Sequence, residues 1–213
     1  MHILITGGNR GIGLGLAEQY RAAGHTVTAT SRDGSTGVAL DVTDAESVRA
    51  LAGAVSEPVD LLVCNAGVYL DKCEDLEGGY APELWAKTFA ANVTGVFLTV
   101  QVMLPHLRAA EGAKIAIISS QMGSSTKAPG NSLIYRTSKA AALNLGINLS
   151  NALKPEGIAV GIYHPGWVQT DMGGAEAGIT VDESVAGLSA RFAALGLENT
   201  GCFENWDGRP HAI

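Results

Sequence analysis

Short apolar runs alternate with longer segments of helical period along the 213 residues of this chain. Apolar runs of this length are typical of parallel strands buried on both faces, and parallel strands must be joined by crossover helices. The alternation therefore predicts an α/β fold: a doubly wound parallel sheet with helices on both faces. Such sheets bind ligands outside the carboxyl ends of their strands, so we expect the functional residues there.

The pattern can be divided into individual elements, with no repeat or linker between them, so we expect a single domain over residues 1–213. Strands are predicted at 2–6, 25–30, 38–40, 61–64, 113–119 and 158–163, and helices at 11–23, 83–108 and 133–153.

The charge balance limits the class of partner. The formal net charge is −7, with only 14 Lys and Arg residues and no basic run, which argues against a nucleic-acid surface or an anionic membrane. We therefore expect small-molecule partners. No apolar run approaches the length of a membrane span, and no leader segment precedes the first strand, so no membrane association is expected.

The cysteines and histidines show no metal-binding pattern. Cys64, Cys73 and Cys202 form no CxxC pair, which favours free thiols and a cytoplasmic location. The five histidines are not spaced as metal ligands, so no metal is predicted.

A glycine-rich loop follows the first expected strand and opens the first expected helix. It reads Thr6-Gly7-Gly8-Asn9-Arg10-Gly11-Ile12-Gly13. Glycines there let the backbone approach a pyrophosphate, and a helix N-terminus attracts its negative charge. The spacing departs from the strict GxGxxG fingerprint, so an ordinary strand-to-helix turn is the alternative. The setting predicts a Rossmann-type dinucleotide site, with contacts from Gly7, Asn9, Arg10, Gly11, Ile12 and Gly13.

The end of the second expected strand bears on the choice of cofactor. In this architecture an arginine there suits a 2′-phosphate, whereas a carboxylate suits a free ribose 2′-hydroxyl. The strand ends Ser31-Arg32-Asp33, and Arg32, helped by Arg10 and Ser31, could clamp a phosphate. We therefore favour NADP(H), while NAD(H) is possible if Asp33 binds the ribose.

Tyr135 and Lys139 lie four residues apart on one expected helix and therefore on the same face. An ammonium beside a phenol favours its ionised form, so the pair could transfer protons. A packed ring beside a solvated ammonium is the alternative.

In these features the chain resembles the short-chain dehydrogenase/reductase family, and within it the subgroup of C-factor and sniffer-type carbonyl reductases. Five motifs of that family occur in order: the loop at 6–13, Asn65-Ala66-Gly67, Asn92 within Ala91-Asn92-Val93-Thr94-Gly95, Ser120 within Ser119-Ser120-Gln121-Met122-Gly123, and Tyr135 with Lys139. The runs at 164–174 and 201–208 are similar to those of the subgroup.

The resemblance implies a role for each catalytic candidate. Tyr135 would donate the proton to a carbonyl oxygen during reduction, and Lys139 would lower the pKa of the phenol and hold ribose hydroxyls. Ser120, rather than Ser119, would orient the carbonyl. Asn92 would hold a water molecule that relays protons to Lys139.

The resemblance also implies the remaining cofactor contacts and a substrate wall. Cofactor contacts are expected from Asp41, Val42, Asn65, Ala66, Gly67, Pro165, Gly166, Trp167, Val168 and Thr170. Substrate contacts are expected from Gln121, Met122, Trp167 and Met172, the last of these in a glycine-rich segment at 172–178 that would close over the site.

The prediction that follows is an NADPH-dependent oxidoreductase that reduces an aldehyde or ketone to an alcohol, reversibly. One alternative is a dinucleotide-binding signalling or regulatory protein without relevant catalysis, and another is an NAD-dependent dehydrogenase. The family commonly pairs its two long helices, here at 83–108 and 133–153, so a homodimer or homotetramer is expected.

Overall fold

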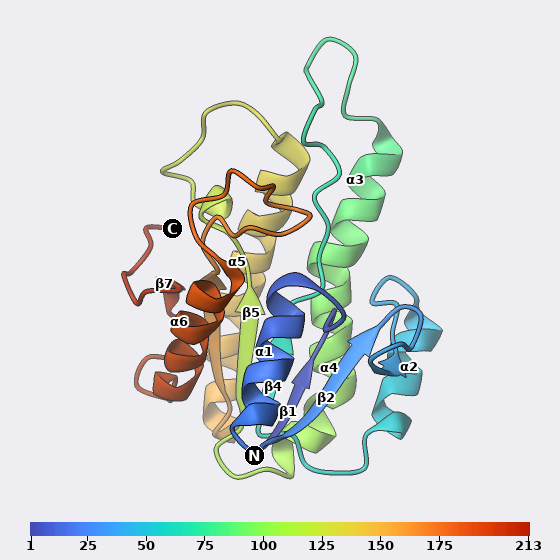
Figure 1. Cartoon of the computed structure of the whole chain (residues 1–213), viewed down its shortest axis with the longest axis vertical. Helices are drawn as coiled ribbons and strands as arrows, with labels where there is room; N and C mark the ends of the chain where they lie inside the picture. Colours follow the sequence, from blue (N-terminus) through green and yellow to red (C-terminus); the bar gives the residue numbers. More distant parts are fainter.

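A seven-stranded parallel sheet forms the centre of the computed structural model, which describes all residues from Met1 to Ile213 (Figure 1). The strand order is β3-β2-β1-β4-β5-β6-β7, and each neighbouring pair is parallel. The strands are β1 (His2–Ile5), β2 (Thr26–Ser31), β3 (Gly37–Ala39), β4 (Leu61–Cys64), β5 (Lys114–Ile118), β6 (Ala159–His164) and β7 (Phe203–Asn205).

Helices cover both faces of this sheet. The α-helices are α1 (Gly11–Ala22), α2 (Ala45–Ala54), α3 (Pro82–Phe89), α4 (Gly95–Arg108), α5 (Leu133–Leu153) and α6 (Val181–Ala194). The shorter helical turns are a π-helical turn at Ala90–Thr94 and 3₁₀ turns at Gln121–Gly123 and Lys154–Glu156.

Alternate residues of a strand point into different cores. Leu4 of β1 belongs to the core under α2 and α4, whereas Ile3 and Ile5 belong to the core under α1 and α6. Because both faces of the strand are buried, its sequence is continuously apolar instead of alternating. The Rossmann-type doubly wound fold expected from the sequence is confirmed.

The chain order of the strands reverses at one point in the sheet. From β1 the chain runs outward through β2 to β3 and then returns to β4 on the other side of β1. The loops after β1 and β4 therefore leave in opposite directions, and they open a crevice at their carboxyl ends. The fold places the candidate site at this crevice.

The predicted elements are found, with small shifts at their ends, but three further elements were missed. The strand Leu61–Cys64 and the helix Leu133–Leu153 have the predicted bounds, whereas α2, α6 and β7 were not predicted. A local signal for α6 was present. The Thr180 hydroxyl accepts a hydrogen bond from the Glu183 amide, and the Glu183 carboxylate accepts one from the Thr180 amide, which is the pairing of a capping box.

The helix expected at 83–108 has the predicted extent but is not one regular α-helix. It changes at Ala90–Thr94 into a π-helical turn, which inserts an extra residue between α3 and α4 and turns the side chain of Asn92 inward.

The expectation that no apolar segment reaches the length of a membrane span is wrong for this same helix. Residues Pro82–Arg108 form 27 helical residues, with a mean hydropathy of 1.4 in their most apolar stretch, and so meet the length and composition of a span. Val96, Val100 and Met103 pack in the core under the sheet, which accounts for the apolar composition.

Helix α5 crosses β6 closely at Gly146. A Cβ atom at Gly146 would lie 2.4 Å from Cγ1 of Ile162, whereas one at Gly53, in α2, would meet nothing within 4 Å. We expect Gly146→Ala to lower the free energy of unfolding by about 1–3 kcal/mol, because the helix must move away from the sheet. Gly53→Ala should raise it by about 0.5–1 kcal/mol, because alanine favours a helix.

Urea unfolding of the two variants beside the wild type measures both effects. Equal midpoints for Gly146→Ala and the wild type would contradict the close approach of α5 to the sheet.

Candidate active site

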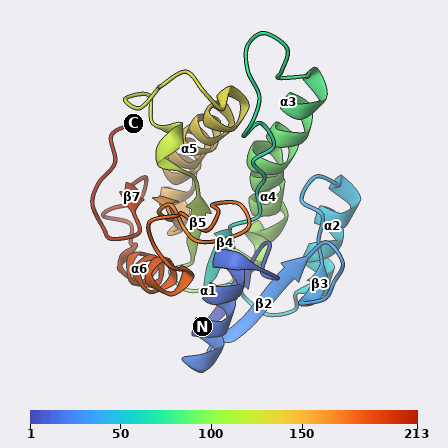
Figure 2. The same cartoon turned by 45° about the horizontal axis from the view of Figure 1, so that its top comes forward.

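A cavity of about 820 Å³ lies at the carboxyl ends of the strands, over the point where the strand order reverses. Figure 2 shows the segment between β6 and α6 lying over this end of the sheet, near the start of α1. Most of the predicted site residues line the cavity: Gly7, Asn9, Arg10, Gly11, Ile12, Gly13, Ser31, Arg32, Asp41, Val42, Asn65, Ala66, Gly67, Tyr135, Lys139, Pro165, Thr170 and Met172.

Several predicted residues do not line this cavity: Asn92, Ser120, Gln121, Met122, Gly166, Trp167 and Val168. Val168 is buried, and the Trp167 indole is 55% exposed and donates a hydrogen bond to the Gly173 carbonyl. Val168 therefore belongs to the internal packing of the segment after β6, and Trp167 lies on its outer surface.

Ten further residues line the cavity. Asp33 had been considered only as the alternative ribose ligand and Ser119 only as the less favoured serine, and the other eight had been given no role. The ten residues are Asp33, Leu40, Thr43, Val68, Ala91, Ile118, Ser119, Gln169, Asp171 and Val181. Most of them are direct neighbours in the chain of a predicted site residue, and this proximity is the sequence signal that could have identified them.

The glycine loop is shaped by two left-handed residues and one close approach. Gly7 and Gly11 have φ values of 68° and 52°, which residues other than glycine rarely adopt. A Cβ atom at Gly13 would lie 2.2 Å from the Gly7 carbonyl oxygen. The loop thus exposes its backbone toward the cavity, and α1 begins at Gly11 without a side-chain cap on its amides.

Asn65 holds this loop in place from β4. Its side-chain amide donates hydrogen bonds to the carbonyl oxygens of Thr6 and Gly7, both at 3.0 Å. In return the Thr6 hydroxyl oxygen accepts the backbone N–H groups of Asn65 and Ala66 at 3.1 and 3.0 Å. The side chain of Asn65 therefore positions the loop.

The end of β2 carries Arg32, which has no ion-pair partner, and Asp33, which accepts hydrogen bonds from neighbouring hydroxyls. Asp33 accepts hydrogen bonds from the hydroxyls of Ser31 and Ser35 at 2.7 and 2.8 Å, and these bonds lower its pKa to about 2. Arg32 is exposed, forms no ion pair and lines the cavity. Arg10 instead pairs with Asp171 at 2.9 Å, and both side chains are mostly exposed, so the pair is weak.

Tyr135 and Lys139 are brought together as predicted, in the first turns of α5, and both are buried. The Lys139 ammonium lies 5.7 Å from the centre of the Tyr135 ring and donates a hydrogen bond to the Ile118 carbonyl at 2.9 Å. Burial lowers the pKa of Lys139 to about 8. The ammonium is thus positioned by the end of β5.

The pKa of Tyr135 is raised in this structure, and its predicted depression by Lys139 stays a prediction. Burial raises the pKa of the phenol to about 12, a hydrogen bond with Ser120 lowers it, and the charges of Tyr69 and Asp71 raise it. Because the loss of hydration outweighs the other effects, the phenol holds its proton at neutral pH.

The two neighbouring serines have different partners. The Ser119 hydroxyl donates to the backbone carbonyl of Lys139 at 2.9 Å. The Ser120 hydroxyl oxygen accepts the Met122 amide at 3.1 Å. Of the two serines, only Ser120 acts on the pKa of the Tyr135 phenol, which it lowers.

Asn92 is fully buried, and its carboxamide is committed to three partners. It accepts the Val68 amide at 2.8 Å, donates to the Val68 carbonyl at 2.9 Å and donates to the Ser138 hydroxyl at 3.0 Å. The side chain therefore joins the segment after β4 to α5, and its predicted part in a water relay stays a prediction.

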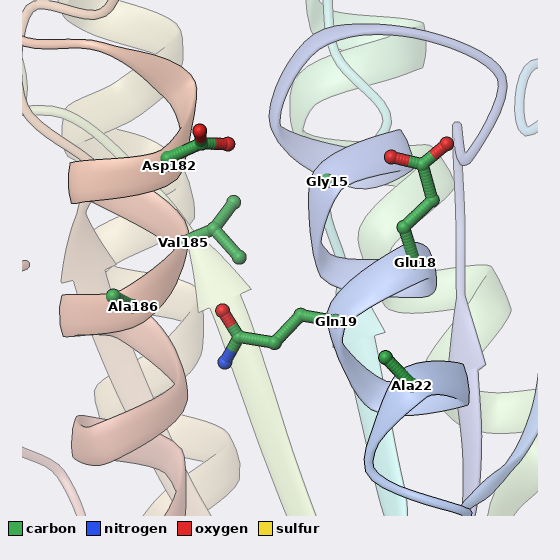
Figure 3. A pocket seen from close by; sticks show the side chains of 7 residues that line it. All are labelled: Gly15, Glu18, Gln19, Ala22, Asp182, Val185 and Ala186. Carbon is green, nitrogen blue, oxygen red and sulfur yellow. The ribbon is translucent and has the colours of Figure 1, made fainter.

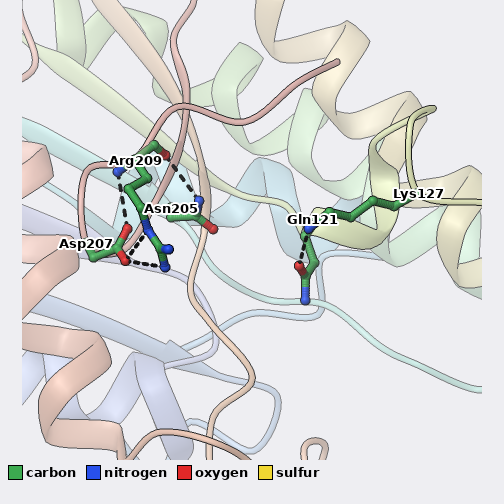
Figure 4. Close-up of polar contacts among 5 residues, drawn as sticks. All are labelled: Gln121, Lys127, Asn205, Asp207 and Arg209. Carbon is green, nitrogen blue, oxygen red and sulfur yellow. Dashed lines mark hydrogen bonds and ion pairs between the residues drawn. The ribbon is translucent and has the colours of Figure 1, made fainter.

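The substrate candidates are divided between two places. Met172 is 41% exposed and lines the cavity. Gln121 does not line the cavity, and it accepts a hydrogen bond from the Lys127 ammonium at 3.0 Å. Figure 4 shows this contact together with a separate ion pair between Asp207 and Arg209 on the C-terminal segment.

A second hollow lies on the outer surface between α1 and α6. Glu18 and Gln19 of α1 face Asp182 and Val185 of α6 across it (Figure 3). No predicted site residue lines it. No group of three or more His, Cys, Asp or Glu side chains is arranged to hold a metal ion.

Comparison with known proteins agrees with this geometry. The family model described as short chain dehydrogenase matches residues 1–178. The chain is 39% identical over 153 residues to C-signal of Myxococcus xanthus, covering 71% of this chain and 90% of that one. The NADPH-bound carbonyl reductase from chicken fatty liver has a TM-score of 0.91 at 32% identity, covering 100% and 98%. Carbonyl reductase Sniffer of D. melanogaster has a TM-score of 0.91 at 28% identity, covering 100% and 99%.

The chain therefore belongs to the short-chain dehydrogenase/reductase family and is an oxidoreductase of that family. Within the family it is similar to C-signal and to the sniffer-type carbonyl reductases, which confirms the resemblance seen in its motifs.

The buried ammonium of Lys139 makes stability depend on pH. Its pKa falls from 10.5 to about 8 on folding, so between these values the unfolded chain binds more protons and stability rises with pH. We expect the free energy of unfolding of the wild type to rise relative to Lys139→Met by up to about 3 kcal/mol across that window.

Denaturant unfolding over the same pH range measures this difference. Lys154→Met, which removes an exposed ammonium, is the matched control. Parallel curves for Lys139→Met and the wild type would show that Lys139 does not carry the pH dependence.

Proposed function

We propose that this protein is an NADPH-dependent reductase of aldehydes or ketones that forms alcohols reversibly, with Tyr135 as the acid and base. The observation that carries the proposal is the placement of Tyr135 and Lys139 in the wall of the cavity that the glycine loop opens. A dinucleotide on the loop and a carbonyl at the phenol would then meet in one site.

The residues present fit a nicotinamide dinucleotide. The left-handed Gly7 and Gly11 and the uncapped start of α1 offer backbone N–H groups and a partial positive charge to a pyrophosphate. Asp41 and Val42 would contact the adenine side, Asn65 to Gly67 the adenosine, and Pro165 and Thr170, which line the cavity, the nicotinamide side. When bound, this cofactor supplies the hydride.

The protein's own groups handle the proton. A phenol with a raised pKa is protonated at neutral pH, so Tyr135 is ready to donate a proton to the carbonyl oxygen during reduction. Ser120, which lowers the pKa of that phenol, would orient the carbonyl. In the reverse direction the phenol must ionise, and the Lys139 ammonium is the cation within reach that favours this.

The end of β2 supports NADP(H) over NAD(H). Oδ1 of Asp33 already accepts hydrogen bonds from the hydroxyls of Ser31 and Ser35, whereas Arg32 forms no ion pair and is free to bind a 2′-phosphate. Arg10, which lines the same cavity and pairs with Asp171, could add a second cation. In an NAD-dependent dehydrogenase the other oxygen of Asp33 would bind the ribose.

The substrate is proposed to be a small carbonyl compound. Met172 alone among the substrate candidates lines the cavity, and it lies in the short segment after β6. A short segment that supplies the one substrate candidate in the cavity wall favours tolerance of varied aldehydes and ketones.

A signalling or regulatory protein without relevant catalysis is the second candidate. The likeness to C-signal, whose name denotes a signal, favours it. The buried and mutually positioned Ser120, Tyr135 and Lys139 favour catalysis, because binding alone does not need a phenol beside an ammonium.

The proposal extends to assembly and location. A homodimer or homotetramer would pair the outer faces of α4 and α5, and Phe97 of α4 is 40% exposed there. Three free cysteines suit a reducing compartment such as the cytoplasm.

Removing the phenolic hydroxyl tests the catalytic proposal. We expect Tyr135→Phe to lower kcat for NADPH-dependent carbonyl reduction by about 10²–10⁴-fold, because the proton donor is lost, while the Kd for NADPH stays within about twofold. NADPH oxidation across a panel of small aldehydes and ketones measures this.

Tyr20→Phe, which alters a buried tyrosine of α1 outside the cavity, is the matched control. Near-normal turnover by Tyr135→Phe would refute the mechanism. Tight NADPH binding with no turnover by the wild type would favour the regulatory candidate.

Reversing the charge at the end of β2 tests cofactor choice. We expect Arg32→Asp to raise the Kd for NADPH by about 10–100-fold, because a charge-assisted bond to the phosphate is replaced by repulsion. The Kd for NADH should change much less. Fluorescence titration measures both constants, with Arg21→Asp, an exposed site on α1, as control. An unchanged preference would remove Arg32 from this role.

A further inference from the structure

A buried carboxylate from a distant segment caps the helix that carries Tyr135. Asp71 is 0% exposed, and its oxygens accept the backbone N–H of Ile134 at 2.8 Å and that of Tyr135 at 3.2 Å. The residue directly before α5, Ser132, is left-handed with φ 50° and gives the helix no side-chain cap. Asp71, more than 60 residues earlier in the chain, satisfies these amides instead.

A second residue of the same segment holds the catalytic ring itself. Tyr69 stacks on Tyr135 with ring centres 4.2 Å apart and an angle of 24° between the planes. Its hydroxyl is hydrogen-bonded to the hydroxyl of Ser132. One face of the Tyr135 ring is therefore covered, and the first turn of α5 is held at two points.

The segment that provides both groups is itself anchored. Val68, its neighbour in the chain, exchanges two hydrogen bonds with the buried carboxamide of Asn92. Asn65, three residues earlier, holds the glycine loop. The stretch from Asn65 to Asp71 thus connects the glycine loop, the π-helical turn and the start of α5.

We propose that Asp71 is a positioning residue for proton transfer: its buried carboxyl group fixes the catalytic turn of α5 and bears on the titration of the Tyr135 phenol. This inference rests on the proposed function, since it assigns a task to a residue of the same site. Tyr69 supports it by fixing the plane of the ring.

The charge has a definite direction of effect. Four groups lie near Tyr135: Tyr69 stacks on its ring, Asp71 accepts its backbone N–H, the Lys139 ammonium is 5.7 Å from the ring centre, and Ser120 from the end of β5 acts on the pKa of the phenol. After burial, which is the largest cause, Ser120 lowers the pKa of Tyr135, and the charges of Tyr69 and Asp71 raise it. A negative Asp71 therefore keeps the phenol protonated, which suits an acid that donates to a carbonyl oxygen.

Asp71→Asn removes the charge and keeps one acceptor oxygen. We expect the Tyr135 phenol to titrate at lower pH in this variant, and the rising limb of the pH profile of alcohol oxidation to move to lower pH with it. We also expect kcat to fall about tenfold in both directions, because the ring is held less well, while the Kd for NADPH is unchanged. A purely structural role would lower stability without moving the titration.

The titration can be followed without turnover. Labelling the tyrosine ring carbons and recording their NMR signals over the alkaline range gives the pKa of Tyr135, whose signal among the five tyrosines is assigned by its loss in Tyr135→Phe. Failure of the proposed function would appear as a wild type with no turnover, whereas the effect of Asp71 on the phenol would still be measured.

Asp75→Asn is the matched control, because Asp75 lies in the same segment, is exposed, and bonds only to the Gly78 amide. An Asp71→Asn variant with the Tyr135 titration of the wild type would overturn the proposal. If Asp71→Asn does not fold, Asp71→Glu decides, since it keeps the charge on a longer side chain. For Asp71→Glu we expect Tyr135 to titrate as in the wild type and kcat to be lower. A kcat equal to that of the wild type, or a shifted Tyr135 titration, would overturn the proposal.

Discussion

The site depends on the hydrogen bonding between β1 and β4, where the strand order of the sheet reverses. Thr6 and Asn65 follow these two strands and exchange backbone and side-chain hydrogen bonds. These bonds hold Gly7, the first glycine of the loop, against the end of β4. The backbone after Gly7 therefore turns toward the cavity. The glycine loop, the cavity and the segment leading to Asp71 all start from this junction.

Buried polar groups of the site are satisfied mainly by backbone atoms. Lys139 donates to the Ile118 carbonyl, Asn92 exchanges bonds with Val68, and Asp71 accepts two helix amides. Burial without these bonds would be costly, since desolvation penalises both polar and charged groups. The same burial lowers the pKa of Lys139 and raises that of Tyr135, so stability and proton chemistry have one physical origin.

Family membership defines the chemistry more firmly than the substrate. The chain belongs to a family of oxidoreductases, and it is similar both to carbonyl reductases and to a protein named C-signal. Activity depends on the site and not on the fold. In this chain Tyr135 and Lys139 line the cavity, whereas Met172 is the only one of the substrate candidates that does.

The sequence by itself determined the parallel sheet, the glycine loop and the Tyr135–Lys139 pair, because each depends on periodicity or on spacing within one element. It also determined the family. Only the tertiary structure decided that Asn92 lies in a π-helical turn, that burial raises the pKa of Tyr135, and that Asp71 caps α5. These features depend on residues far apart in the chain and on the removal of water, and neither leaves a local pattern in the sequence.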